Sequence, residues 1–334
     1  MKIVNLEGKI ICQDQSSRLQ KFLYTNLEKS FWKRLLLKIL ITKPISWLVN
    51  LYFYSPWSCQ YAFKIIEQYQ IDLNLFEKQK FSSYNDFFTR KYKELAIPQD
   101  NFAFISPCES KLSIYPISKK AIYCIKETNY SLVDLLQNPT LAQEYEEGYL
   151  LIFRLEPHDY HRYLFVDEGF FQMPPCKIKG KLHTVNPIAF ESFDVFKTNT
   201  REYSILQTKN FGKIVQVEVG ATLVGKIQNH PLQTFSKGQE KGYFDTGGST
   251  IIILVKKNIV AFDPRILEHT QKRYETQIPI LTVIGKKIIP TKIHQITYKS
   301  STFETITPPN QNKIKTPIAP HKPINKESEV QTLE

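Results

Sequence analysis

The pattern of apolar residues changes near Ala103, and this change constrains the fold more than any other feature of the sequence. Before it, apolar residues recur at helical spacing, whereas after it short apolar runs with strand-like alternation follow one another. Residues 213–219, KIVQVEV, place three valines on one face and Gln216 and Glu218 on the other. Helices followed by many short strands predict an α+β fold, in which N-terminal helices pack on a β-rich domain of short, mostly antiparallel strands.

Helices are expected at 30–42, 45–54, 59–71 and 84–92, with Ser30 as an N-cap and Pro44 ending the first. Strands are expected at 111–117, 121–126, 149–155, 163–166, 213–219, 222–227, 250–255 and 279–284. These patterns divide the chain into a helical region, a β-rich domain and a tail, at 1–100, 101–295 and 296–334.

The tail is expected to be disordered. Five of the 19 prolines follow Ser301, and no aromatic residue follows Phe303. Such a segment has too little apolar surface to form a core of its own. Its lysines and acidic residues are similar in number, so it is not a basic arm for nucleic acid.

The chain has 44 Lys and Arg against 32 Asp and Glu, a net charge of +12. This balance favours anionic partners such as a membrane surface or nucleic acid. No basic stripe interleaved with aromatic residues or known module is visible, so we do not expect nucleic-acid binding. The five cysteines include no C-x-x-C pair, which argues against a disulfide framework or a zinc knuckle and fits a reducing compartment.

The helices expected at 30–42 and 45–54 have two interpretations. They can be buried core helices, or they can lie in a membrane interface with basic flanks and with Trp32, Trp47 and Trp57 as anchors. The longest uncharged stretch, 44–63, contains a proline and several polar residues and is a poor transmembrane span. The N-terminus lacks the apolar core and cleavage site of a secretory signal. Contact with a membrane would therefore be peripheral.

Three segments contain residues suited to catalysis. The GGST turn at 247–250 can be a hairpin turn, or Gly248–Ser249 can be a self-cleaving bond, because glycine allows a strained backbone. The loop after 153–155 contains His158 and His161, which could be hydrogen-bonding residues, acid/base groups or metal ligands. No third ligand is evident, so we expect no metal. Glu109 lies in the turn ISPCESK, where solvation is its ordinary role.

Taken together, the chain resembles the phosphatidylserine decarboxylase family, and most of all its bacterial second subtype. The resemblance extends over nearly the whole chain to about residue 290. The segments that carry it occur in the family's order: YNDFFTRKYKELAIP (84–98), ISPCESKLSIYPI (105–117), EPHDYHRYLFVDEG (156–169), GKLHTVNPIA (180–189), NTREYSILQTKNFGKIVQVEVGATLVGKI (199–227) and KGQEKGYFDTGGST (237–250).

The resemblance implies a zymogen that cleaves itself between Gly248 and Ser249, leaving a pyruvoyl group on Ser249. The large chain would be 1–248 and the small chain 249–334. The pyruvoyl ketone would form a Schiff base with phosphatidylserine, release carbon dioxide and yield phosphatidylethanolamine. Residues 1–100 would then be membrane-associating and 101–295 the catalytic domain. The protein would lie peripherally on the cytoplasmic face of the cell membrane. Substrate-binding residues are not identified.

Two residues depart from the family's relay of Asp, His and Ser. Glu109 stands where the family has the Asp, and Leu164 stands where it has the relay His. In the family, the residue that His161 matches is linked to decarboxylation. Either His161 serves both steps, or His158 or His183 substitutes as the base, or processing is slow or absent. The second hypothesis is therefore an unprocessed member that binds anionic phospholipid without turnover. A third is decarboxylation of another amino-acid-like substrate.

Overall fold

The computed structural model describes residues 2–13, 22, 30–40, 43–125, 128–180, 198–220, 226–246 and 249–289. The chain divides into two units, Met1–Ile289 and Pro290–Glu334. All described residues belong to the first unit. The expected disordered tail at 296–334 therefore lies outside the described residues and stays a prediction.

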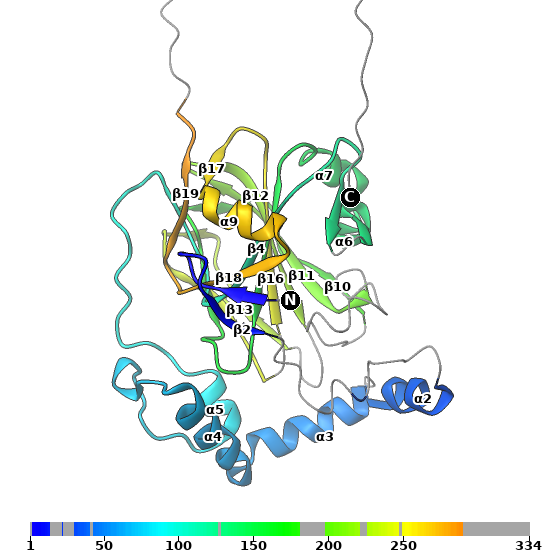
Figure 1. The fold of residues 1–334 in the computed structure, drawn as a ribbon, viewed down its shortest axis with the longest axis vertical. Coiled ribbons are helices and arrows are strands. Elements are labelled where there is room, and N and C mark those ends of the chain that lie inside the picture. Colours follow the sequence, from blue (N-terminus) through cyan, green and yellow to red (C-terminus); the bar gives the residue numbers. More distant parts are fainter. Residues whose placement is uncertain are drawn as a thin grey trace, which may run out of the picture. The chain divides into compact units, whose positions relative to one another are not determined.

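One large sheet of eleven strands forms the centre of the first unit (Figure 1). Its strands pair antiparallel except for β1 and β18, which pair parallel. In sheet order they are β14 (Thr234–Phe235), β9 (Gly169–Phe171), β11 (Arg201–Thr208), β12 (Gly212–Gly220), β16 (Ser249–Val255), β7 (Tyr149–Leu155), β4 (Ser110–Pro116), β18 (Tyr274–Ile278), β1 (Lys2–Val4) and β2 (Ile10–Gln13), with β10 (Cys176–Ile178) on β11.

Smaller antiparallel sheets accompany the large one. They are β13 (Ile227–Asn229), β15 (Glu240–Phe244) and β8 (Arg162–Leu164); then β17 (Val260–Phe262), β19 (Val283–Lys287) and β3 (Ala103–Ile105); and the pair β5 (Ile122–Ile125) and β6 (Thr128–Ser131). Short antiparallel strands with segregated helices confirm the α+β prediction.

Both faces of the large sheet are buried. On β12 and β16, Val217 and Ile252 are paired and belong to one core cluster, which also contains residues of α6 (Leu132–Leu136) and α7 (Pro139–Gln143). Ile251 and Ile253 belong to the second cluster, together with residues of β8 and of α9 (Pro264–Gln271). Burial on two faces explains why β16 is apolar throughout most of its length and does not alternate.

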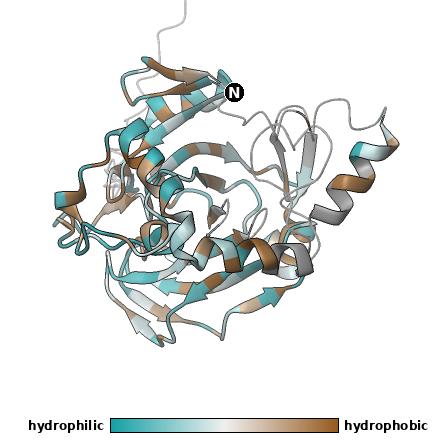
Figure 2. Ribbon diagram, turned by 90° about the horizontal axis from the view of Figure 1, so that it is seen from below, coloured by the Kyte–Doolittle hydropathy of each residue, from teal (hydrophilic) through white to brown (hydrophobic). Residues whose placement is uncertain are grey.

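Helices of the N-terminal region gather at one end of the strands in Figure 1, with α3, α4 and α5 in contact. Hydrophobic and hydrophilic residues both occur on these helices in Figure 2. The elements are α2 (Phe31–Leu40), α3 (Lys43–Tyr54), η2 (Pro56–Ser58), α4 (Cys59–Tyr69), η3 (Leu73–Leu75) and α5 (Tyr84–Phe88). The Ser30 hydroxyl accepts a hydrogen bond from the Lys33 amide, as expected of an N-cap. Pro44 lies in the first turn of α3, where its missing N–H costs nothing.

Several elements differ from the sequence-based expectations; β11 and α9, for example, were not expected. Residues 2–4 and 10–13 form strands of the large sheet, although the region 1–100 was expected to be helical. The strand expected at 279–284 begins only at Val283, because Leu281 has a φ of 66° and turns the chain between β18 and β19. Helix α5 ends at Phe88, and the Arg162 guanidinium binds the carbonyl oxygen of Thr89 just beyond it.

Candidate active site

Ser249 is the first residue of β16, and its neighbours on both sides are strands. It is paired with Gly220 of β12 and with Leu155, the last residue of β7. The side chain is fully buried, and its hydroxyl has no hydrogen-bond partner among the described residues. A buried hydroxyl without a partner is costly, and Ser249 shares this property with Ser204 and Thr250. Gly248, on the other side of the expected cleavage bond, lies outside the described residues.

His161 lies in the loop that joins β7 to β8 and is also fully buried. Its Nδ1 is 2.9 Å from the carbonyl oxygen of Asp159, and its ring packs 3.7 Å, centroid to centroid, from that of Phe88. A carbonyl oxygen only accepts hydrogen bonds, so Nδ1 must donate and Nε2 must hold the lone pair. Nε2 has no partner among the described residues. Burial, together with the nearby charge of Arg90, holds the pKa of His161 well below its usual range, so the ring is a neutral base.

The loop carrying His161 is tied to the segment that leads into Ser249. The amide of Phe244 donates to the carbonyl oxygen of His161 at 3.0 Å. From Phe244, four residues lead to Ser249, which is itself paired with Leu155 immediately before the loop. The structure thus brings the backbones around the two unpartnered groups to the same end of β7 and β16.

The Glu109 side chain contacts this loop at one of the loop's backbone amides. Its carboxylate accepts a hydrogen bond from the Tyr160 amide at 3.1 Å. Burial, and then repulsion by Asp159, raises the pKa of Glu109 to about 7, although Arg90 opposes the shift. Among the described residues, the Nδ1 partner of His161 is Asp159 and not Glu109. Glu109 therefore holds the position of the residue next to His161 rather than the histidine ring itself.

A fully buried network of charged side chains adjoins the loop. The Lys111 ammonium lies 2.8 Å from Asp159 and 3.1 Å from Glu156. Arg154 bonds Glu275 at 2.6 Å and Glu156 at 2.9 Å. Although burial opposes it, the charges of Arg154 and Lys111 lower the pKa of Glu156 to about 2. Sequence reasoning missed Lys111, Arg154 and Glu156; charged residues inside or at the end of apolar strands were the signal that could have found them.

His158 belongs to this network, whereas the Ser249 hydroxyl and Nε2 of His161 do not. Its Nε2 is 3.2 Å from the Lys111 ammonium, and its ring stacks on that of Tyr69 with centroids 3.8 Å apart. Glu156, His158 and Asp159 present donor atoms within 4.8 Å of one another, as a metal site would. The Lys111 ammonium already gives all three a cationic partner. His158 is thus a poorer candidate for a base than His161.

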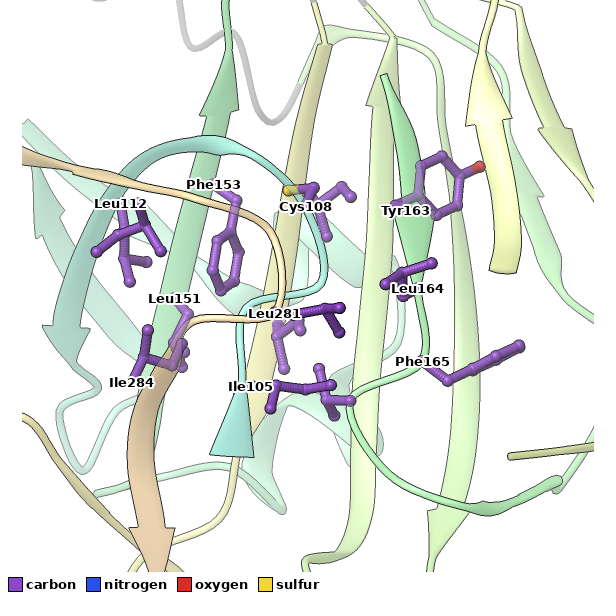
Figure 3. Close-up of a cluster of buried hydrophobic side chains, with 14 of the residues drawn as sticks. Ile105, Cys108, Leu112, Leu151, Phe153, Tyr163, Leu164, Phe165, Leu281 and Ile284 are labelled. Carbon is purple, nitrogen blue, oxygen red and sulfur yellow. The ribbon is translucent and has the colours of Figure 1, made fainter. Parts of the chain in front are cut away.

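Leu164 occupies the position of the missing relay histidine. It is buried on β8 in the second core cluster, with Ile105, Cys108 and Leu281 nearby (Figure 3). Its amide donates to the carbonyl oxygen of Pro107 at 2.9 Å, which joins β8 to the turn that carries Glu109. The side chain fills apolar space and offers no proton acceptor. His183, the other candidate for a substitute base, lies outside the described residues.

A cavity of about 880 Å³ lies elsewhere on the molecule, between β9, β11 and β14. Its lining includes Phe170, Lys209 and Phe235, and it includes none of Ser249, His161 and Glu109. The cavity therefore does not identify residues that would bind a substrate at Ser249.

Comparison with known proteins supports the resemblance on which the site was assigned. The family model described as phosphatidylserine decarboxylase matches residues 84–277. Phosphatidylserine decarboxylase proenzyme 2 of Clostridium acetobutylicum is 42% identical over 269 residues, covering 80% of this chain and 91% of the relative. Phosphatidylserine decarboxylase proenzymes of Clostridium botulinum and Clostridium tetani are 43% and 44% identical over 67% and 66% of this chain, covering 78% and 77% of the relatives.

Proposed function

Because the chain belongs to the phosphatidylserine decarboxylase family, we propose that it decarboxylates phosphatidylserine to phosphatidylethanolamine after cleaving itself between Gly248 and Ser249. The observation that carries this proposal is the family match, together with a fully buried Ser249 at the start of β16 and a fully buried, neutral His161 in the loop that follows β7. The relatives are named proenzymes, which agrees with a chain that must be processed.

In the proposed processing, Nε2 of His161 accepts the hydroxyl proton of Ser249. The oxygen attacks the carbonyl carbon of Gly248, and the acyl group moves from nitrogen to oxygen to give an ester. Loss of the α-proton of Ser249 then expels the Gly248 carboxylate and leaves dehydroalanine. Water releases ammonia from this residue, and a pyruvoyl group remains at the start of the small chain, 249–334.

The surroundings of Ser249 suit such a group. The residue is fully buried between two strands, and Gly220 opposite it has no side chain. When formed, the pyruvoyl group supplies an electron sink for loss of carbon dioxide. His161 is placed to hold a proton at Nε2, and Glu109 and Arg90 fix its loop through Tyr160 and His158.

Leu164 motivates one other candidate function. Its side chain is buried among apolar residues and cannot accept a proton, so a chain in which His161 fails as the processing base would stay uncut. Such a chain could still bind anionic phospholipid without turnover. Retention of Ser249 and of the glycines before it favours the enzyme over this alternative.

The N-terminal helices are proposed to rest on the cytoplasmic face of the cell membrane. Trp32, Trp47 and Trp57 are 75%, 62% and 81% exposed, and Phe63 is 61% exposed. Exposed tryptophans on helices of a basic protein suit the interface of an anionic bilayer. No helix among the described residues is long and apolar enough to span a membrane.

Intact mass under denaturing conditions tests the enzymatic proposal. Cleavage of the 39.1 kDa chain should give fragments of about 29 and about 10 kDa, the smaller lighter than its amine form by one ammonia. Ser249→Ala should remain one chain without activity. Ser204→Ala is the control, because that hydroxyl is also buried and without a partner among the described residues. An uncut wild-type chain, with and without phosphatidylserine vesicles, would favour the lipid-binding alternative.

Sedimentation with vesicles tests the membrane proposal. Trp57→Ala should weaken binding to vesicles of phosphatidylserine and phosphatidylcholine. Phe170→Ala, at an aromatic residue 49% exposed in β9, should not. Equal loss in both variants, or equal binding of the wild type to vesicles of phosphatidylcholine alone, would contradict a docking surface on the helices.

A further inference from the structure

Three successive backbone amides just before the cleavage bond are each held by a different part of the molecule. Phe244 donates to the carbonyl oxygen of His161 at 3.0 Å, and Asp245 donates to that of Lys226 at 3.0 Å. Thr246 donates to the side-chain Oδ1 of Asn85 at 3.3 Å, and this bond is buried. Beyond the bond, Ser249 is fixed between two strands. The two glycines at 247 and 248 thus join two anchored ends.

Asn85 is the one of these three acceptors that comes from a side chain. It lies in α5, and it is only 8% exposed. We term this buried contact between the Asn85 side chain and the Thr246 amide the clamp.

The clamp rests on a packed base. The rings of Phe53 and Tyr84 lie 5.0 Å apart, centroid to centroid, which joins α3 to α5. The Tyr84 amide donates to the Ser58 hydroxyl at 2.9 Å. Asp245 is only 4% exposed and Thr246 is fully buried. Because the residues around it are tightly packed, the clamp can hold the backbone at residues 245–246 in one position.

We propose that Asn85 is a positioning residue for self-cleavage, which holds Thr246 in place while the Ser249 hydroxyl attacks the peptide bond before it. The inference rests on the proposed function. Attack by a hydroxyl on the carbonyl before it requires a narrow range of distance and angle. An anchor on each side of the reacting bond therefore raises the fraction of the chain that can react. The helical region would thereby contribute to processing as well as to membrane contact.

After cleavage the clamp holds a free chain end, and it has no further part in the reaction. Cleavage rate and turnover of the cut enzyme can therefore be measured separately, and a merely structural role would not change one without the other. Asn85→Ala and Asn85→Leu should each slow cleavage about tenfold or more, because both remove the oxygen that accepts from the Thr246 amide. Decarboxylation per pyruvoyl group in the fraction that is cut should stay at the wild-type value. Asn85→Leu keeps about the same side-chain volume and so serves if Asn85→Ala fails to fold.

Full-length variants are made by cell-free synthesis, and cleavage is followed by intact mass over time. Pyruvoyl groups are counted by their reaction with phenylhydrazine. Controls are Asn74→Ala and Asn74→Leu, at an exposed amide in η3. Slow cleavage with unchanged turnover in both clamp variants, and in neither control, would support the clamp.

Cleavage at the wild-type rate in both clamp variants would overturn the inference. So would equal slowing in the controls, or a parallel loss of cleavage and turnover. These results leave the proposed function standing, because the wild type is still cut. A wild-type chain that never cleaves would instead refute the proposed function and the clamp with it.

Discussion

The loop between β7 and β8 places two kinds of buried polar group side by side. In the network around Lys111, every charged group has a close partner of opposite sign: Lys111 with Asp159 and Glu156, and Arg154 with Glu156 and Glu275. Ser249 and His161 are equally buried, yet the hydroxyl and Nε2 have no partner among the described residues.

The difference separates what holds the site from what reacts in it. Paired buried charges are costly to break and keep the loop in place. Unpaired buried groups give up stability, but their lone pairs and protons are not already engaged in a hydrogen bond. His161 shows both properties, since Nδ1 is fixed by Asp159 while Nε2 stays free.

The largest expected effect follows from removing the free base. His161→Gln should slow cleavage by about 10²- to 10⁴-fold, the range that general base catalysis contributes. Time courses of intact mass measure this rate. His269→Gln is the control, because His269 is buried and has its Nδ1 3.0 Å from Thr276. Cleavage of His161→Gln at the wild-type rate would assign the base elsewhere, with His183 the next candidate.

Breaking the paired network should cost stability. Lys111→Met leaves Asp159 and Glu156 without their buried cation, and the free energy of unfolding should fall by about 3–5 kcal/mol. Denaturant titration of the single-chain Ser249→Ala background measures it. Lys286→Met removes an exposed pair with Asp100 and should cost no more than about 1 kcal/mol. Equal effects of the two substitutions would show that the network does not hold the loop.

Glu109 contacts the loop that carries both Asp159 of the charged network and His161, and it should give the cleavage rate a pH dependence. Its pKa of about 7 lies above the unfolded value of about 4.3, so its contribution to stability is present below pH ~4.3 and is lost as pH rises through 7. The carboxylate is the stronger acceptor for the Tyr160 amide. Cleavage should therefore rise about tenfold per pH unit below 7 and level off above it. Glu109→Gln should flatten the profile, and an unchanged profile would remove Glu109 from processing.

The smallest effect on the cleavage rate is expected from Leu164→His, which introduces a histidine where the family has its relay base. Leu164→His should leave the cleavage rate within about threefold of the wild type if His161 is already the base, and it should destabilise the core by about 1–3 kcal/mol. Leu164→Met controls for the loss of leucine packing. A large gain in cleavage rate on introducing histidine would show that the natural chain lacks an efficient base.

Local patterns predicted much of the fold because their signals do not depend on distant residues. Ser30 caps α2 as expected, and β7 occupies 149–155, the range that its apolar run predicts. Strand β18 was not predicted. Strand β19 was placed too early, because the left-handed turn at Leu281 is held by the distant Ser106. The first two strands were also missed, since β1 is stabilised by pairing with β18 from the opposite end of the domain.

The sequence alone determined the family and the α+β class, because consecutive motifs and a local periodicity carry them. It also predicted Ser249 as the cleavage serine and Glu109 and Leu164 as substituted relay positions, and these stay predictions. Only the tertiary structure decided which polar groups of the site are paired. It paired His158 with Lys111, left Nε2 of His161 free, and set Asn85 against Thr246. These distinctions depend on which residues distant in sequence share a buried space, where an unpaired polar atom is costly and a paired one is fixed.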